Sequence, residues 1–138
     1  MTTNTIVMYN AIPEEDFTTP SSTAKYPMGT IIKVDTGTGE EKAYIYVASH
    51  TTLTAYQPYQ VSFNGTYLIT KAPATGAGLL VVPQVAFTSG YYGFALMKGL
   101  GKCLLTAETY ALGDQLEVLT TGTAAVVDGS TGSTARTV

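Results

Sequence analysis

The segment from Tyr91 to Lys98 constrains the fold more than any other part of the chain. Alternate residues of a strand point to opposite faces, and here neither face is polar: Tyr92, Phe94 and Leu96 share one face, and Gly93, Ala95 and Met97 share the other. A strand that is apolar on both sides must be covered on both sides. The small residues on one face also permit the close approach of another backbone.

Short strand patterns separated by turn residues fill most of the remaining sequence. Residues 30–34 and 42–47 alternate around a polar loop, Asp35–Glu40, and predict a hairpin. Residues 60–63 and 67–70 flank Asn64-Gly65, a pair typical of two-residue hairpin turns. Further strands are expected at 79–82, 84–88, 102–106, 115–119 and 124–127, with a tight turn at Gly99–Gly101. The pattern predicts an all-β fold, a small β-barrel or β-sandwich of short antiparallel strands.

The first 28 residues differ from the rest and predict an extended N-terminal arm, followed by a β domain at 29–138. The arm contains Pro13, Pro20 and Pro27 and a Thr/Ser-rich run, and proline disfavours helix in the residue before it. Such an arm packs either on its own domain or on a neighbouring chain. Its apolar residues are therefore the candidate partner-binding residues: Ile6, Val7, Met8, Tyr9, Ile12, Phe17 and Tyr26.

Composition excludes several classes of function. Only 12% of the residues are charged and the net charge is -3, so the sequence offers no basic stripe for nucleic acid. The N-terminus does not resemble a secretory signal, and no apolar run is long enough for a membrane helix. Cys103 is the single cysteine and His50 the single histidine, so we expect no disulfide, metal or cofactor.

Catalytic motifs are also not expected. Gly99–Cys103 is similar to the end of a phosphate-binding loop, but Cys103 stands where that loop needs Ser or Thr. Ser49 and His50 are adjacent, and neighbouring residues of a strand point to opposite faces. We therefore expect that the protein is not an enzyme. Strand tyrosines and one methionine are expected at subunit contacts instead: Tyr44, Tyr46, Tyr91 and Met97.

Residues 91–129 resemble the C-terminal portion of capsid decoration, or cement, proteins of tailed bacteriophages. The likeness is carried by an aromatic-glycine strand, a short apolar run, a Gly-Asp step before a leucine, and a turn around Gly122. These are Tyr92–Gly99, Lys102–Thr106, Ala111–Leu116 and Thr121–Thr123. The resemblance implies a β-barrel-like structural protein on the outer surface of the capsid that bridges and stabilises major capsid protein subunits.

The same resemblance implies a virion protein assembled in the host cytoplasm, with the major capsid protein as partner and a homo-oligomer, in particular a homotrimer, as its own state. Neither nucleic acid nor membrane is expected as a partner. The alternative function is a glycan-binding or fibre/tail-associated module of a phage particle, which would use exposed tyrosines such as Tyr44 and Tyr46.

Overall fold

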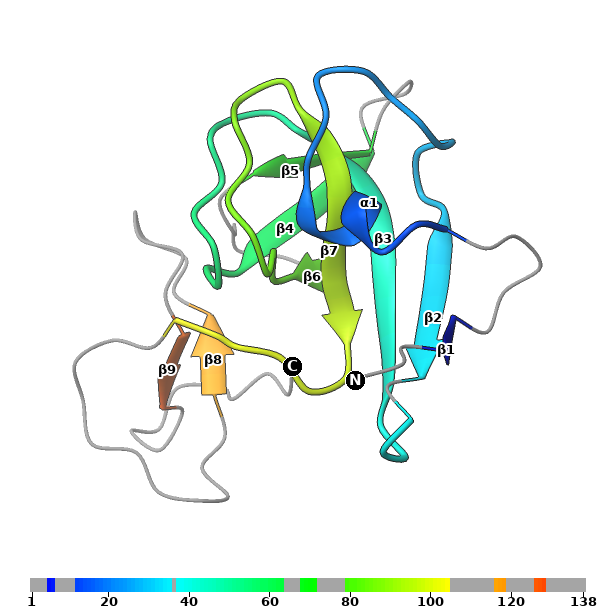
Figure 1. The fold of residues 1–138 in the computed structure, drawn as a ribbon. Helices are drawn as coiled ribbons and strands as arrows, with labels where there is room; N and C mark the ends of the chain where they lie inside the picture. Colours follow the sequence, from blue (N-terminus) through cyan, green and yellow to red (C-terminus); the bar gives the residue numbers. More distant parts are fainter. Residues whose placement is uncertain are drawn as a thin grey trace.

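The chain forms a mostly β domain in the computed structural model (Figure 1). The structure describes residues 5–6, 12–35, 37–63, 68–71, 79–104, 116–118 and 126–128. Their elements are β1 (Thr5–Ile6), α1 (Glu15–Thr18), β2 (Ile31–Asp35), β3 (Glu41–Ser49), β4 (Tyr59–Phe63), β5 (Leu68–Lys71), β6 (Leu79–Val81), β7 (Tyr92–Lys98), β8 (Leu116–Val118) and β9 (Val126–Asp128). The all-β fold class is confirmed, with a single one-turn helix in the described part.

Strand β3 lies at the centre of the sheet. It pairs antiparallel with β2, from Ile31 opposite Ile45 to Asp35 opposite Glu41, so the hairpin expected around Asp35–Glu40 is confirmed. It also pairs antiparallel with β7. At its end, Ala48 and Ser49 pair in parallel with β5. The sheet then continues through β4 to β6, and β1 adds two residues to the far side of β2.

The far end of this sheet curls back toward β7. Val82, directly after β6, pairs with Leu96 through two backbone hydrogen bonds of 2.8 and 3.2 Å. This contact is one isolated bridge and not a ladder, and the described strands form no closed barrel. β8 and β9 pair with each other in a separate two-stranded sheet.

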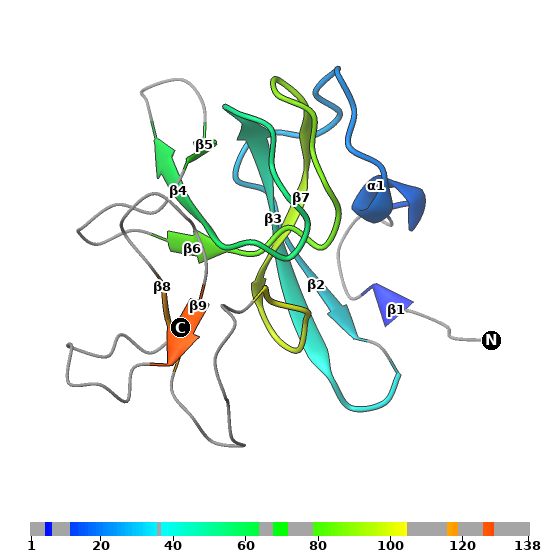
Figure 2. The same ribbon diagram turned by 90° about the vertical axis from the view of Figure 1, so that its left-hand side faces the viewer.

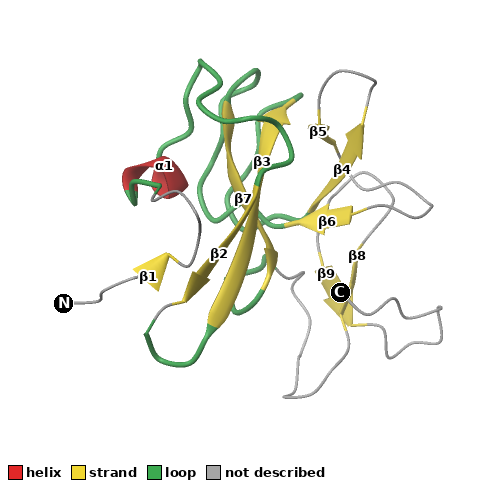
Figure 3. Ribbon diagram, turned by 90° about the vertical axis from the view of Figure 1, so that its right-hand side faces the viewer, coloured by secondary structure: helices red, strands yellow, loops and turns green. Residues whose placement is uncertain are grey.

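Two hydrophobic cores lie on opposite faces of β3 and β7. The first contains Ile45, Val47, Leu53, Tyr59, Val61, Val81, Phe87 and Ala95. The second contains Ile12, Ile32, Val34, Tyr46 and Phe94. Figures 2 and 3 show the resulting layers: α1 lies on one side of β3 and β7, and β4 and β6 lie on the other. The prediction that the strand at 91–98 is covered on both faces is confirmed.

Three expected features differ in the structure. β4 and β5 form the antiparallel hairpin expected around Asn64-Gly65, but Phe63 pairs with Leu68, so four residues and not two separate the paired ends. Within 84–88, the pairing is a single bridge between Phe87 and Leu53. Residues 101–104 form no strand, although β7 is followed by the expected turn, in which Gly99 has a φ of 105°.

The side chain of Gln84 explains why 101–104 need no partner strand. Its amide nitrogen donates to the Lys102 carbonyl at 3.1 Å, and its amide oxygen accepts from the Lys102 N–H at 3.0 Å. The Leu104 N–H donates to the Tyr56 carbonyl at 2.7 Å. The Gln84 side chain and the Tyr56 carbonyl thus provide the hydrogen bonds to Lys102 and Leu104 that a neighbouring strand would otherwise provide.

Gly93 is the position where the small face of β7 matters most. A Cβ atom added there would lie 2.7 and 2.8 Å from two ring atoms of Phe87. Phe87 is 1% exposed and Gly93 is itself buried, so the ring has little room to move. The small residues of this strand were expected to admit another backbone, whereas the group packed most closely against Gly93 is the aromatic ring of Phe87.

We predict that Gly93→Ala lowers the free energy of unfolding by about 1–3 kcal/mol, the usual cost of overpacking a core. Urea unfolding followed by far-UV circular dichroism measures the change. Phe87→Leu should cost less in the Gly93→Ala background than in the wild type, because the smaller side chain relieves the contact. If the two losses in free energy of unfolding simply add in the double variant, contact with the Phe87 ring is not the cause of the destabilisation.

Candidate functional site

The N-terminal candidates that the structure describes lie on their own domain. We refer to residues 12–28 as the strap. Ile12 is 7% exposed in the second core, and Phe17 and Tyr26 pack against that core. Ile6 belongs to β1, whereas Val7, Met8 and Tyr9 lie outside the described residues. Of the two placements left open for the arm, the strap takes the one on its own sheet.

The strap and two of the tyrosines expected at subunit contacts meet in one aromatic cluster. The ring centroids of Phe17 and Tyr44 lie 5.3 Å apart, edge to face, and those of Tyr26 and Tyr46 are also 5.3 Å apart, nearly perpendicular. Phe94 lies 4.9–5.5 Å from Phe17, Tyr26 and Tyr46. Such pairs contribute about 0.5–1.5 kcal/mol each beyond the area they bury.

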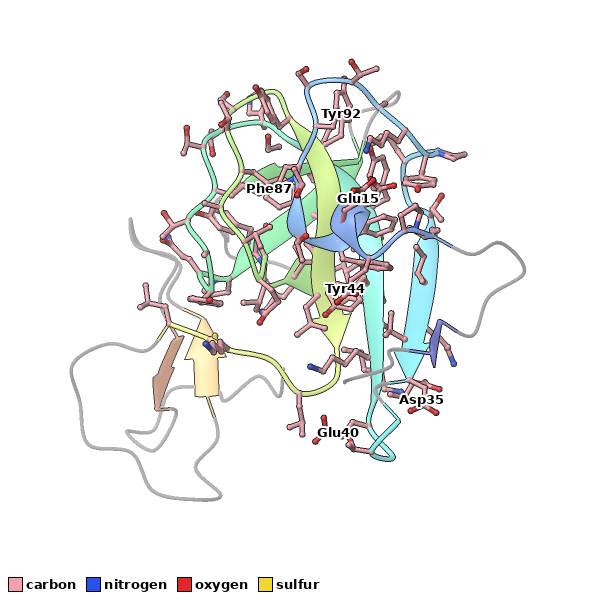
Figure 4. All side chains as sticks on the ribbon, viewed as in Figure 1. Glu15, Asp35, Glu40, Tyr44, Phe87 and Tyr92 are labelled. Carbon is pink, nitrogen blue, oxygen red and sulfur yellow. The ribbon has the colours of Figure 1, made fainter. Side chains whose placement is uncertain are left out.

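Tyr44 and Tyr46 therefore face the strap. Tyr46 is 2% exposed, and its hydroxyl oxygen accepts the Lys25 backbone N–H at 3.0 Å. Tyr44 is half-buried beside Phe17, and Figure 4 shows it below α1. Because its side chain is buried, Tyr46 does not provide the exposed platform that the glycan-binding alternative requires.

Backbone hydrogen bonds fix the strap to the sheet at two further points. Ser21 and Tyr92 form an antiparallel bridge with N···O distances of 2.9 and 2.8 Å. The Gly29 N–H, just after the strap, donates to the Tyr46 carbonyl at 2.8 Å. Backbone hydrogen bonds to β7 and β3 thus hold this segment in place in addition to the side-chain packing.

Asp16 closes the strap on itself. It is 8% exposed, and one carboxylate oxygen accepts Lys25 Nζ at 2.5 Å while the other accepts the Tyr26 hydroxyl. Burial alone would raise the pKa of Asp16, but the hydrogen bonds from Lys25 and Tyr26 outweigh it and hold the pKa below its ordinary value. We refer to these three residues as the clasp.

Helix α1 places Asp16 for this role. The backbone N–H of Asp16 donates to the Pro13 carbonyl at 3.0 Å, and that of Phe17 donates to the Glu14 carbonyl at 3.1 Å. Proline followed by acidic residues is a helix-start signal, because carboxylates favour the positive end of the helix. The arm was expected to be extended with few regular elements, and this single turn of helix is one that the expectation did not name.

Tyr91 and Met97, the other two residues expected at subunit contacts, are also partly buried in the chain. Met97 packs against the first core, next to an irregularity where the pairing of β7 shifts between Ala43 and Tyr44. The Tyr91 backbone is held by Ser49, whose hydroxyl oxygen accepts the Tyr91 N–H at 3.0 Å. Buried Ser49 thus supports a turn, and this position gives it no role as a nucleophile.

The remaining reactive groups form no catalytic arrangement in the described structure. His50 is exposed and follows Ser49 at the end of β3. Burial raises the pKa of the Cys103 thiol, although a backbone hydrogen bond acts in the opposite direction, and a protonated thiol is a weak nucleophile. Among the described residues, no group of three or more His, Cys, Asp or Glu side chains could hold a metal ion.

The end of the β2–β3 hairpin forms an open surface feature. Lys33, Asp35, Gly39, Glu40 and Glu41 line an open hollow of about 280 Å³ there. Asp35 accepts the Gly37 N–H at 2.8 Å, and Lys33 pairs with Glu41 at 3.3 Å. Figure 4 shows Asp35 and Glu40 at this end, away from α1. The large exposed apolar side chains of the described part are Ile31, Leu79, Leu100 and Leu104.

Comparison of the chain with protein-family models, curated proteins and solved structures finds no match. In the part of the chain that the structure describes, no helix has the length and apolar character needed to span a membrane.

We predict that Asp16→Asn lowers the free energy of unfolding by about 1–2 kcal/mol at neutral pH, because the charge-assisted hydrogen bonds of the clasp are lost. The folded-state pKa of Asp16 is lowered, so its contribution is present above the unfolded-state value of about 3.9. It disappears as the pH falls through the folded-state pKa.

Urea unfolding of wild type and Asp16→Asn from about pH 3 to pH 7 tests this linkage. The difference between the two proteins should shrink as the pH falls below about 4. Glu14→Gln, an exposed change in the same segment, serves as the control and should change stability little. A difference that is constant with pH would contradict the charged clasp.

A second prediction concerns Tyr26, whose burial and hydrogen bond to Asp16 raise its pKa to about 12. The neutral phenol is the form the fold stabilises, so its contribution is present below about pH 10. It is lost between about 10 and 12 as the phenol ionises. Tyrosinate absorbance should show one more late-titrating phenol in the wild type than in Tyr26→Phe. If Tyr26→Phe instead removes a phenol that titrates near pH 10, the raised pKa of Tyr26 is contradicted.

Proposed function

We propose that this chain is a structural protein of a tailed-bacteriophage particle that binds the outer surface of the capsid and stabilises it by bridging major capsid protein subunits. The observation that carries the proposal is the likeness of residues 91–129 to capsid decoration proteins. The resemblance implies a barrel-like domain. The Val82–Leu96 bridge, which brings the end of the sheet back to β7, supports that part of it.

The described surface is consistent with such a role. It presents no arrangement of catalytic groups, and the chain has few charges for its size. Many copies of a modest contact give a shell large avidity, so a decoration protein needs no deep binding pocket. The proposed partner is the major capsid protein, and the proposed state of the protein itself is a homotrimer.

The strap's role in shell binding needs revision under this proposal. Ile12, Phe17 and Tyr26 contribute to the chain's own second core, and residues that stabilise one fold are not free for a second contact. We therefore assign the shell contact to the hairpin end, residues 35–41, where Asp35 and Glu40 flank exposed glycines.

Co-sedimentation with capsid shells of the phage that encodes the chain tests the proposal. The intact protein should bind shells saturably, and the decorated shells should rupture at a higher temperature than bare shells. Absence of saturable binding to mature shells would refute the decoration function. Light scattering of the free protein measures the proposed trimer separately.

A charge reversal in the loop tests the proposed contact. Glu40→Lys should weaken shell binding by about tenfold, since reversing a charge at a complementary interface places like charges opposite each other, which is costly. Glu14→Lys, which makes the same change on the exposed side of the strap, should bind as the wild type does. If both variants bind shells equally well, the loop is not the contact, and the proposal of shell binding itself still stands.

A further inference from the structure

Three segments of the chain meet where β3 ends and β7 begins. We refer to them together as the hydroxyl end, and they are residues 21–24, 49–52 and 88–92. Ser21 and Tyr92 join the first segment to the third through their backbone bridge. Buried Ser49 joins the second to the third, since its N–H donates to the Tyr91 carbonyl at 2.8 Å and its carbonyl accepts the Gly90 N–H at 3.0 Å. Backbone hydrogen bonds therefore fix the three segments relative to one another.

The hydroxyl end exposes small polar side chains beside partly exposed Tyr91. His50 aside, the three segments contain no Asp, Glu, Lys or Arg. Figure 4 shows Tyr92 at the end of the sheet away from Asp35 and Glu40, so the hydroxyl end is separated from the charged hairpin. The exposed polar side chains include Thr23, His50, Thr51, Thr52, Thr88 and Ser89.

This composition is typical of recognition loops carried by a rigid β framework, where binding residues are concentrated. Antibody loops are enriched in Tyr, Ser and Gly, because tyrosine rings give contact area at a small entropic cost and hydroxyls give adaptable hydrogen bonds. Residues 88–92 read Thr-Ser-Gly-Tyr-Tyr. Their turn is closed by the Tyr91 N–H, which donates to the Thr88 carbonyl at 3.0 Å, and its third residue, Gly90, has a φ of 82°. The shape of this loop is thus set before any ligand binds.

The chemistry of the hydroxyl end selects a class of ligand. Phosphate groups and nucleic acid need basic partners, and these segments contain no Lys or Arg. The large exposed apolar side chains of the described part, at 31, 79, 100 and 104, belong to none of the three segments, so they supply no anchor for a lipid here. Hydroxyls both donate and accept hydrogen bonds, and a tyrosine has an apolar ring with a polar tip. A neutral sugar presents the matching groups, an apolar C–H face and a ring of hydroxyls.

We propose that the hydroxyl end binds neutral oligosaccharides. The Tyr91 ring stacks on the sugar, and the exposed hydroxyls and His50 form hydrogen bonds to it. The site is an open surface, so a single copy binds weakly and many copies displayed together bind strongly. The proposal does not rest on shell binding, because the hairpin assigned to the shell and the hydroxyl end lie at opposite ends of β3, Glu41–Ser49.

Beads coated with many copies of the full chain, applied to a printed array of neutral oligosaccharides, test the proposal. The wild type should bind at least one of them, and Tyr91→Ala should weaken that binding by about tenfold because the stacking surface is lost. Thr51→Lys should also weaken it, since it places an unpaired charge against a neutral ligand. Tyr56→Ala is the matched control and should bind as the wild type does, because it removes another partly exposed tyrosine, one that lies beside Lys102.

Urea unfolding of each variant shows whether it keeps the fold, and exposed Thr51→Lys keeps the test decisive if Tyr91→Ala does not fold. Failure of the wild type to bind any neutral oligosaccharide would overturn the proposal. Equal binding by the wild type and Thr51→Lys would overturn the site. If Thr51→Lys loses shell binding and no sugar is bound, the hydroxyl end is a protein contact and the proposal is wrong.

Discussion

The pairing of β3 with β7 is the constraint on which the rest of the structure depends. Both strands are apolar on both faces, so the ladder is stable only where two separate covers exclude water from it. One cover is the curled part of the sheet, with Phe87 packed against Gly93. The other is the strap. Residues at the beginning of the chain are therefore as much a part of the folded domain as the central strands.

The strap shows how a segment with few apolar residues can cover such a face. Its tyrosine and the tyrosines beneath it serve twice, since each ring packs while a hydroxyl such as that of Tyr46 accepts a backbone N–H. Burying Asp16 costs free energy that its two partners offset. Among the described residues, no buried side-chain polar atom lacks a hydrogen-bond partner. The cover is thus held by specific polar contacts as well as by apolar area.

Alternation of residues was sufficient to predict the β2–β3 hairpin and the two covered faces of β7. It could not predict where the strap lies, because a period of two identifies an apolar face and leaves its cover unspecified. The clasp was missed because nine and ten residues separate Asp16 from its partners, which is no local motif. The one available signal for α1 was the proline followed by acidic residues. Residues 102–104 were wrongly expected to belong to a strand. The Gln84 side chain makes the two hydrogen bonds to the Lys102 backbone that a partner strand would otherwise make.

The same placement changes how partner contacts of this chain should be sought. Apolar and aromatic residues in an N-terminal segment suggest a binding arm, yet in this fold Ile12, Phe17 and Tyr26 have an intramolecular use that accounts for them. A variant of these residues would affect the fold before any interface, so loss of binding in it would not identify a contact. Positions outside both cores, such as Glu40, separate the two effects, because their side chains belong to neither core.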